Sequence, residues 1–307
     1  MKFIPDREIT VTNAIKEYLA YSKSIGSLSS SSLYNRGIEL RRLKNYLLEM
    51  NVSNVSDIQK HMLITYLGDI DVSAGTKKTI MNIICSFLDY LINENLILDN
   101  YLASVKKPKV YEIEGDYLSK EEIDHLFYTL VNTTNEKLID RNLLLVSLFT
   151  VLCMRVTETL QLKISDVHIN ESVIWVNRKG GKIAKLPLNE NLIDQFQNWY
   201  EIRKSFKKGS NSIWVFISTH GKQMTVRQAR NVVEKAIKKA GIVKRKNGPH
   251  LLRHSGATLY LKQGEDIKTI QYLLGHSNLT TTSKYVHSDS ATLRNSINNC
   301  PVLVKKY

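Results

Sequence analysis

Two histidines and an arginine occur within five positions of PHLLRHSGATLYL, the stretch that covers residues 249–261. Pro249 follows a glycine and suits the first turn of a helix, so we expect a helix that begins near His250. Residues three and four positions apart share one face of a helix, which brings His250, Arg253 and His254 together. A polar face of this composition needs a bound partner.

A metal ion and a phosphate are the two partners to consider. A His-x-x-x-His pair can ligate zinc, but the metalloprotease motif has glutamate beside the first histidine, where this chain has Leu251. Arginine in the same turn also repels a divalent cation. A phosphate instead suits arginine, which offers two parallel charged hydrogen bonds, and histidine, which offers a titratable donor. The motif favours phosphate, and histidines that only pack in a core remain the alternative.

Other segments carry side chains suited to the same chemistry. Arg155 follows an apolar run in LCMRVTETL, where an unpaired guanidinium would be costly, so it needs Glu158 or a bound anion as partner. LLGHSNLTTTSKYVH supplies His276 and, nine residues later, Tyr285. The loop RKGGK supplies Lys179.

RVTE, HLLRH, LLGH and the tyrosine nine residues past the last histidine occur in the order and approximate spacing of the tyrosine recombinases, or phage-type integrases. The chain resembles the two-domain members of the XerC/XerD kind, over residues 118–290. The resemblance implies a mainly α fold with a small β-sheet. An N-terminal helical bundle, the SAM-like core-binding domain, would precede an α+β catalytic domain.

The resemblance also implies the principal catalytic roles. Arg155 and Arg253 match the arginines that clamp the nonbridging oxygens of the scissile phosphate. Tyr285 matches the nucleophile, which leaves a 3′-phosphotyrosine link and a free 5′-hydroxyl. The chemistry agrees, because attack on phosphorus concentrates negative charge on those oxygens.

Three further residues match positions that handle protons. His250 matches the residue at the tyrosine, His276 the donor to a phosphate oxygen, and Lys179 the acid that protonates the departing 5′-oxygen. Lys182 lies close to Lys179 in the sequence and is its rival. The chemistry implies no metal and no cofactor, since the covalent link retains the energy of the phosphodiester.

The sequence departs from the family pattern just before the first arginine. Cys153 and Met154 stand where the family usually has glycine and leucine. Cysteine lacks the freedom of glycine at positive φ, so we expect either a slightly different turn or, preferably, simple packing of the thiol. We expect a structural role for His254, with a DNA-backbone contact as the alternative.

Helical periodicity indicates how these residues are positioned. It runs through four stretches of the first hundred residues, 11–26, 29–50, 57–70 and 73–97. The pattern lapses around Pro108 and Gly115. We therefore expect an N-terminal helical DNA-binding domain at 1–107, a linker at 108–117 and a catalytic domain with a C-terminal tail at 118–307.

The catalytic domain combines helical and extended patterns. Residues 140–155 predict a buried helix that ends at Arg155, and 172–188 predict a hairpin around two glycines. Residues 212–218 predict a further strand. The apolar end of the tail predicts packing on a neighbouring protomer, with docking on its own domain as the alternative.

Charge is unevenly distributed along the chain. The net charge is +14, with 14 basic against 12 acidic residues in 1–112 and 29 against 17 in 113–307. Such an excess favours a nucleic-acid partner, although a merely basic surface is the alternative. The expected DNA-binding residues are Arg36, Arg41, Arg42, Lys44, Lys77, Lys78, Lys182, Lys244, Arg245 and Lys246.

Composition excludes other classes. No stretch resembles a membrane span or secretory signal, and the three scattered cysteines predict reduced thiols, so we expect a cytoplasmic protein. The resemblance implies a site-specific recombinase that acts on double-stranded DNA as a homotetramer on two sites. A type IB topoisomerase and a DNA-binding protein with a vestigial site are the alternatives.

Overall fold

The computed structural model describes residues 6–26, 28–109, 116–178, 181–206, 211–275, 290–300 and 302. The chain divides into two compact units, residues 1–113 and 114–307. No helix of the described chain is long and apolar enough to cross a membrane.

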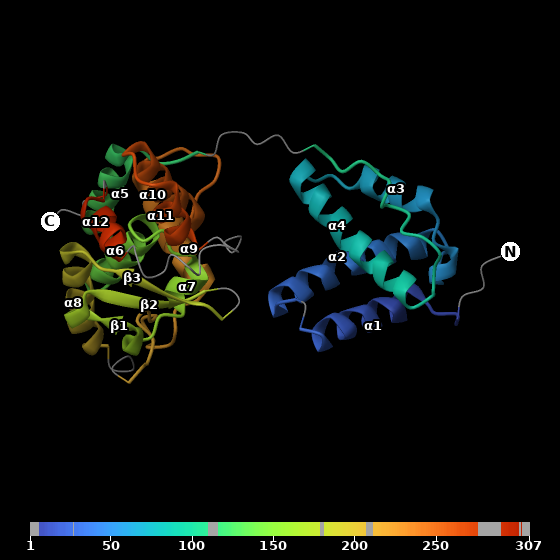
Figure 1. Ribbon diagram of the computed structural model, residues 1–307, viewed down its shortest axis with the longest axis horizontal. Helices are drawn as coiled ribbons and strands as arrows, with labels where there is room; N and C mark the ends of the chain where they lie inside the picture. The colour runs from blue at the N-terminus through green and yellow to red at the C-terminus, as the bar shows by residue number, and fades with distance from the viewer. Residues whose placement is uncertain are drawn as a thin grey trace. The chain divides into compact units, whose positions relative to one another are not determined.

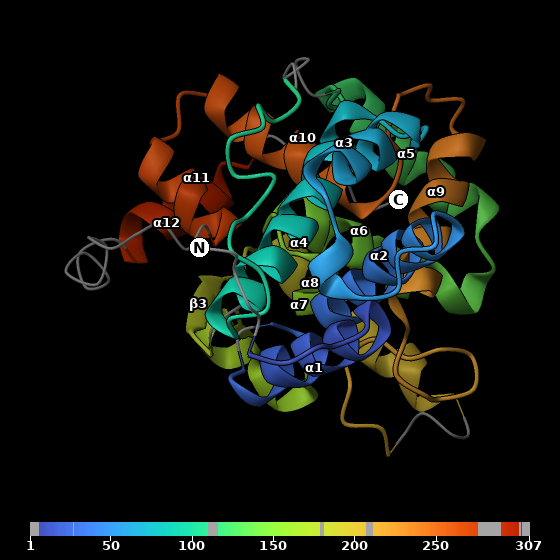
Figure 2. The same cartoon turned by 90° about the vertical axis from the view of Figure 1, so that its right-hand side faces the viewer.

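The first unit is a helical bundle in its described residues. Its α-helices are α1 (Val11–Ser24), α2 (Ser30–Glu49), α3 (Lys60–Asp69) and α4 (Ala74–Asn93). The hydroxyl groups of Thr10, Ser29 and Ser73 accept from backbone N–H groups three residues on, and so cap three of these helices. Contacts join α1, α2 and α4 pairwise, and α3 packs on α2 (Figures 1 and 2).

The four predicted helical stretches of this unit are confirmed. The third helix begins at Lys60 rather than at Asp57, because Val55–Asp57 form a separate 3-10 turn.

The second unit is built around a helix whose C-terminal half, residues 144–150, is buried. Its helices are α5 (Lys120–Thr133), α6 (Glu136–Thr150), α7 (Val156–Leu160), α8 (Glu190–Lys204), α9 (Val226–Lys239), α10 (Pro249–Lys262), α11 (Ile267–Leu274) and α12 (Ser290–Asn298). Helix α6 packs against α5, α8 and α10 (Figure 1), and all its residues from Leu144 to Phe149 are buried. The run is apolar on every side because it has neighbours on every side.

A small antiparallel sheet lies beside these helices. Strands β1 (Val167–His168), β2 (Val173–Asn177) and β3 (Ile183–Pro187) pair in that order, with Trp175 opposite Lys185. The predicted hairpin and the mainly α fold with a small sheet are confirmed.

The strand predicted at 212–218 is wrong. Val215 and Phe216 are buried, as the apolar run suggests, but only isolated bridges form, Lys163 to Trp214 and Ile217 to Gln223. Burial in the helical core, rather than sheet pairing, accounts for these apolar residues.

The predicted C-terminal end of the helix over 140–155 is also wrong. Helix α6 stops at Thr150, and Cys153 adopts φ +49, which a helix cannot contain. Arg155 is extended and caps α7, where its backbone N–H donates to the Glu158 carboxylate at 2.8 Å. Arg155 therefore belongs to a helix start rather than to a helix end.

The described part of the tail docks on its own unit. Leu293, Ile297, Cys300 and Val302 are buried in the core of this unit, and Asn189 Nδ2 donates to the Ile297 carbonyl at 3.2 Å. Within the apolar end that we expected to pack on a neighbouring protomer, the structure describes Val302 alone, and this residue docks on its own unit; packing of the rest of that end stays a prediction.

Gly256 allows α10 to approach α6 closely. An ideal Cβ at this position would lie 1.9 Å from the carbonyl oxygen of Thr150 and 3.2 Å from Cys153 Sγ. Because backbone must shift, Gly256→Ala is expected to lower the free energy of unfolding of this unit by about 3 kcal/mol. Urea-induced unfolding would measure the change.

Gly68 provides the matched control for that substitution. It too is helical, and nothing lies within 4 Å of its ideal Cβ, so Gly68→Ala is expected to be neutral or to stabilise by about 0.5–1 kcal/mol. If Gly256→Ala were as stable as the parent protein, the close approach of Gly256 on α10 to the Thr150 carbonyl at the end of α6 would not contribute to stability.

Candidate active site

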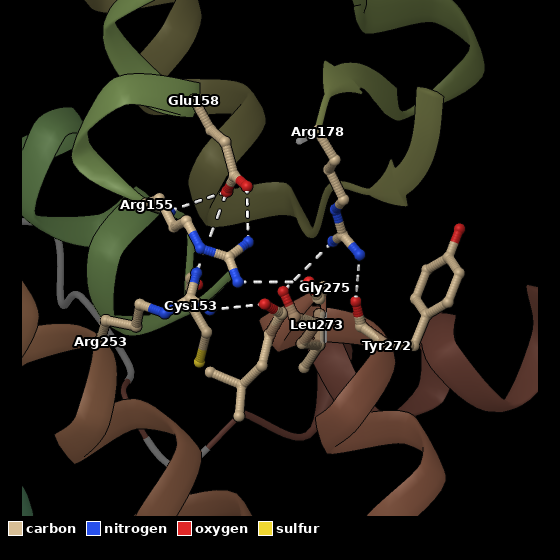
Figure 3. A network of polar contacts seen from close by, with 9 residues as sticks. Cys153, Arg155, Glu158, Arg178, Arg253, Tyr272, Leu273 and Gly275 are labelled. Atoms are coloured by element: carbon tan, nitrogen blue, oxygen red, sulfur yellow. Dashed lines mark hydrogen bonds and ion pairs between the residues drawn. The ribbon is translucent and has the colours of Figure 1, made fainter. Parts of the chain in front are cut away.

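Arginines from three segments converge on the C-terminal turn of α11 (Figure 3). Arg155 comes from the start of α7, Arg178 from the residue after β2, and Arg253 from the first half of α10. The three positions are far apart in the sequence, so only the tertiary fold brings them together.

Each guanidinium donates to main-chain carbonyl oxygens at this helix end. The bonds are Arg178 Nη1 to Tyr272 (2.5 Å), Arg178 Nη2 to Leu273 (3.2 Å), Arg253 Nη2 to Leu274 (2.5 Å) and Arg155 Nη2 to Gly275 (3.2 Å). The last carbonyls of a helix have no partners within it and carry its negative pole, so cations are favoured there. The arginines thus cap α11.

A buried carboxylate holds two of these arginines. Glu158 is 6% exposed and accepts from Arg155 Nη1 at 2.8 Å, while Arg253 Nη1 lies 3.9 Å from it. Arg253 Nη1 also donates to the Cys153 carbonyl at 2.5 Å. These contacts confirm that Arg155 has Glu158 as a partner and fix both guanidinium groups in orientation.

Positive charge exceeds negative charge in this network. Among the described residues of this network, Glu158 is the single carboxylate, and it pairs with Arg155 and Arg253, whereas Arg178 contacts main-chain carbonyls alone. Burial, and then the neighbouring Arg155, lower the pKa of Arg253 to about 10. Burial also lowers the pKa of Arg178. A bound anion would relieve this repulsion, and the Arg155 side chain is 32% exposed and can reach one.

His250 lies at the first turn of α10 and faces the same cations. Gly248 precedes the helix with φ +116 and Pro249 occupies its first turn, as predicted. Burial, followed by Arg253, Arg230 and Arg155, lowers the pKa of His250 below its usual value. The imidazole is therefore neutral at pH 7 and able to accept a proton.

Arg230 provides a test of that environment. Arg230→Gln removes one repelling cation, so it is expected to raise the pKa of His250, measured by NMR titration of the imidazole. Because the neutral imidazole is the proton acceptor, the rate of any reaction that depends on it decreases as the pH drops through this lowered pKa. Arg227→Gln, earlier on α9, is the control, and an equal effect of both would contradict a local cause.

The other predicted catalytic residues, Lys179, His276 and Tyr285, lie outside the described residues. Two of them directly follow members of the arginine network: Lys179 follows Arg178, and His276 follows Gly275. His254 is exposed, and its main-chain carbonyl accepts from the Thr258 hydroxyl at 2.9 Å.

Several of the predicted DNA-binding cations contact other groups of the protein. The pairs are Arg36 with the Tyr18 hydroxyl, Arg42 with Glu39, Lys77 with the Gly68 carbonyl, Lys244 with Glu122 and Arg245 with Asp116. The Lys182 carbonyl accepts from the Arg178 N–H across the hairpin. DNA contact by these residues, and by Arg41, Lys44, Lys78 and Lys246, stays a prediction.

The sequence did not predict Arg178 as part of this site. Its partners are main-chain carbonyls, which leave no signature in residue type. The available signal was its position, directly before Lys179 at the end of a strand.

Comparison with known proteins identifies the family. The model of the phage integrase family matches residues 116–292, more than half of the chain. The chain belongs to the phage integrase family. The match spans Arg155, Arg253 and Tyr285, and the resemblance to tyrosine recombinases is confirmed.

Curated relatives match nearly the whole chain. Tyrosine recombinase XerD of Staphylococcus epidermidis is 29% identical over 287 residues, covering 91% of this phage integrase family member and 95% of the relative. Tyrosine recombinase XerD of Staphylococcus haemolyticus is 28% identical over 291 residues, covering 92% and 97%.

Solved structures share the fold. XerH site-specific recombinase bound to difH substrate, in a pre-cleavage complex, matches with a TM-score of 0.71 and 23% identity over 93% of this chain and 94% of that one. A lambda integrase dimer bound to a COC′ core site matches with a TM-score of 0.69 and 22% identity over 91% and 78%.

Proposed function

We propose that this protein is a site-specific tyrosine recombinase that cleaves and rejoins double-stranded DNA through a 3′-phosphotyrosyl intermediate at Tyr285. The observation that carries the proposal is the pair of arginines, Arg155 and Arg253, oriented by the buried carboxylate of Glu158. Membership of the phage integrase family and the curated relatives named tyrosine recombinase support it.

The arginine pair suits the charge that develops in phosphoryl transfer. As an oxygen nucleophile attacks phosphorus, negative charge grows on the nonbridging oxygens, and fixed donors stabilise it without reorganising. When DNA binds, guanidinium N–H groups of Arg155 and Arg253 that donate to carbonyls at the end of α11 would instead donate to those phosphate oxygens. His276 would donate to one of them.

Two proton transfers complete the proposed reaction. The Tyr285 phenol has an ordinary pKa near 10 and needs both nearby cations and a proton acceptor, a role that suits neutral His250. As the bond from Tyr285 to phosphorus forms, the bond from phosphorus to the 5′-oxygen breaks, and Lys179 protonates that oxygen. Attack by another 5′-hydroxyl reverses these steps, so the reaction needs no metal or nucleotide cofactor.

Recombination also requires that the protein hold DNA and a second copy of itself. We propose that residues 1–107 form a DNA-binding domain joined by a linker at 108–117 to the catalytic domain at 118–307. The proposed assembly is a tetramer on two DNA sites in the cytoplasm. Related structures contain XerH bound to difH substrate and a lambda integrase tetramer bound to a Holliday junction, which supports this assembly.

Site selection followed by strand exchange tests the function. Footprinting on random DNA libraries, with sequencing of the bound fragments, would supply a target site. A plasmid that carries two copies of that site is expected to recombine, and a nicked substrate is expected to trap a covalent adduct.

The alternatives give different results in the same assays. A type IB topoisomerase would form the adduct and relax supercoils without exchange between sites. A vestigial site would bind DNA and form no adduct.

A further inference from the structure

Arg178 joins the hairpin of β2 and β3 to the end of α11. Its backbone N–H donates to the Lys182 carbonyl at 2.8 Å and closes the hairpin. Its side chain leaves the hairpin, and the two terminal nitrogens donate to the successive carbonyls of Tyr272 and Leu273 (Figure 3). One residue therefore fixes a loop to a helix terminus more than ninety positions away.

The end of α11 is shaped to receive this guanidinium. Gly275 has φ +55, and a Cβ there would lie 2.9 Å from both Arg178 Cδ and Nη1. The Arg178 Cζ lies 5.3 Å from the centroid of the Tyr272 ring, within reach of a cation–π contact. A planar fork that spans two successive carbonyls is a property of arginine that lysine lacks.

This arrangement is not optimised for stability alone. Arg178 Nε is buried and finds no hydrogen-bond acceptor within the described part of the chain. An unpaired buried donor is costly, and burial already disfavours the charged form of this side chain. A role beyond capping the helix would account for this cost.

We propose that Arg178 is a positioning residue for the leaving-group step. Lys179 is the next residue in the sequence and is therefore covalently joined to the anchored Arg178. By fixing the base of the loop on α11, Arg178 limits where the Lys179 ammonium can reach. The inference rests on the proposed function, and on Lys179 as the acid that protonates the 5′-oxygen.

A sulfur leaving group separates this role from capping or DNA binding. In a suicide substrate with sulfur in place of the bridging 5′-oxygen, a thiolate departs, and its pKa of about 8.5 makes protonation unnecessary. Arg178→Lys keeps the charge but removes the fork. It is expected to slow single-turnover cleavage of the oxygen substrate about 100-fold, and to stay within about threefold of the parent rate on the sulfur substrate.

Matched variants sharpen the comparison. Lys179→Met is expected to show the same rescue by sulfur, and adding Arg178→Lys to it is expected to cause no further loss on the oxygen substrate, because Arg178 acts through Lys179. Lys185→Gln removes an exposed charge from the same hairpin, where the Lys185 ammonium lies 3.7 Å from the Glu171 carboxylate, and is expected to leave both rates unchanged. Both substrates are compared in one protein preparation, so partial unfolding does not alter the ratio of rates.

Several results would overturn the proposal. Arg178→Lys could cleave the oxygen substrate at the parent rate, could lose the same factor in rate on both substrates, or could lose DNA affinity in parallel with rate. Lys179→Met could also fail to recover its cleavage rate on the sulfur substrate. Failure of the proposed function is distinct, because the parent protein would then form no adduct on either substrate.

Discussion

Replacing Tyr285 with phenylalanine is expected to abolish the covalent protein–DNA adduct while DNA affinity stays within about twofold of the parent value. The substitution removes only the oxygen that would bond to phosphorus. Binding depends on many phosphate contacts spread over a basic surface, so the loss of one hydroxyl changes it little. A nicked suicide substrate, followed by denaturing electrophoresis, measures the adduct, and fluorescence anisotropy measures affinity.

Tyr272→Phe is the control for that experiment. This variant keeps the ring and the carbonyl that Arg178 contacts and removes a hydroxyl that donates to the Lys185 carbonyl at 3.3 Å, so adduct formation is expected to persist. Tyr260 is unsuitable as a nucleophile because its hydroxyl is buried and donates to the Val151 carbonyl at 2.9 Å. An adduct that survives Tyr285→Phe would remove Tyr285 from the mechanism.

Helix starts could be predicted from the sequence because their causes are local. Ser119 and Glu122 form a capping box at the start of α5, and Pro249 opens α10 as expected. Each of these features needs only residues within one turn. The apolar residues at 212–218 have the composition of a strand, and only the tertiary fold determines that they pack without a sheet partner.

The turn before Arg155 shows why a departure from the family pattern can be tolerated. Cys153 adopts φ +49 and is also fully buried, so the turn keeps a left-handed residue while the thiol packs. Burial raises the pKa of this thiol to about 12, which makes it unreactive. Its carbonyl accepts from Arg253, which ties the turn to the arginine network.

The candidate site could be predicted only in part. Arg155 and Arg253 carry recognisable motifs, and the structure brings them to one carboxylate. The capping of α11 by arginines depends on main-chain carbonyls, which no sequence pattern distinguishes. The sequence marks Arg178 only by its position before Lys179, and its contacts with α11 emerge from the tertiary structure.

Arg155→Ala is expected to reduce the rate of single-turnover cleavage about 100- to 1,000-fold and to weaken DNA binding far less. A fixed donor contributes most where charge develops, and the ground-state phosphate has other cations to contact. Removing one phosphate contact should lower the salt dependence of binding by about one unit of slope. Anisotropy titrations at several salt concentrations, beside the cleavage assay, would measure both effects.

Arg155 is a better probe of the clamp than Arg253, because the two side chains differ in burial. The Arg253 side chain is 9% exposed, and its removal would leave the Cys153 and Leu274 carbonyls without their donor, so Arg253→Ala is expected to unfold this region as well as slow cleavage. Arg155 is 32% exposed, and Glu158 keeps Arg253 nearby when Arg155 is removed. If Arg155→Ala lost cleavage rate and DNA affinity by the same factor, Arg155 would stabilise bound DNA and the transition state equally and would not contribute to catalysis.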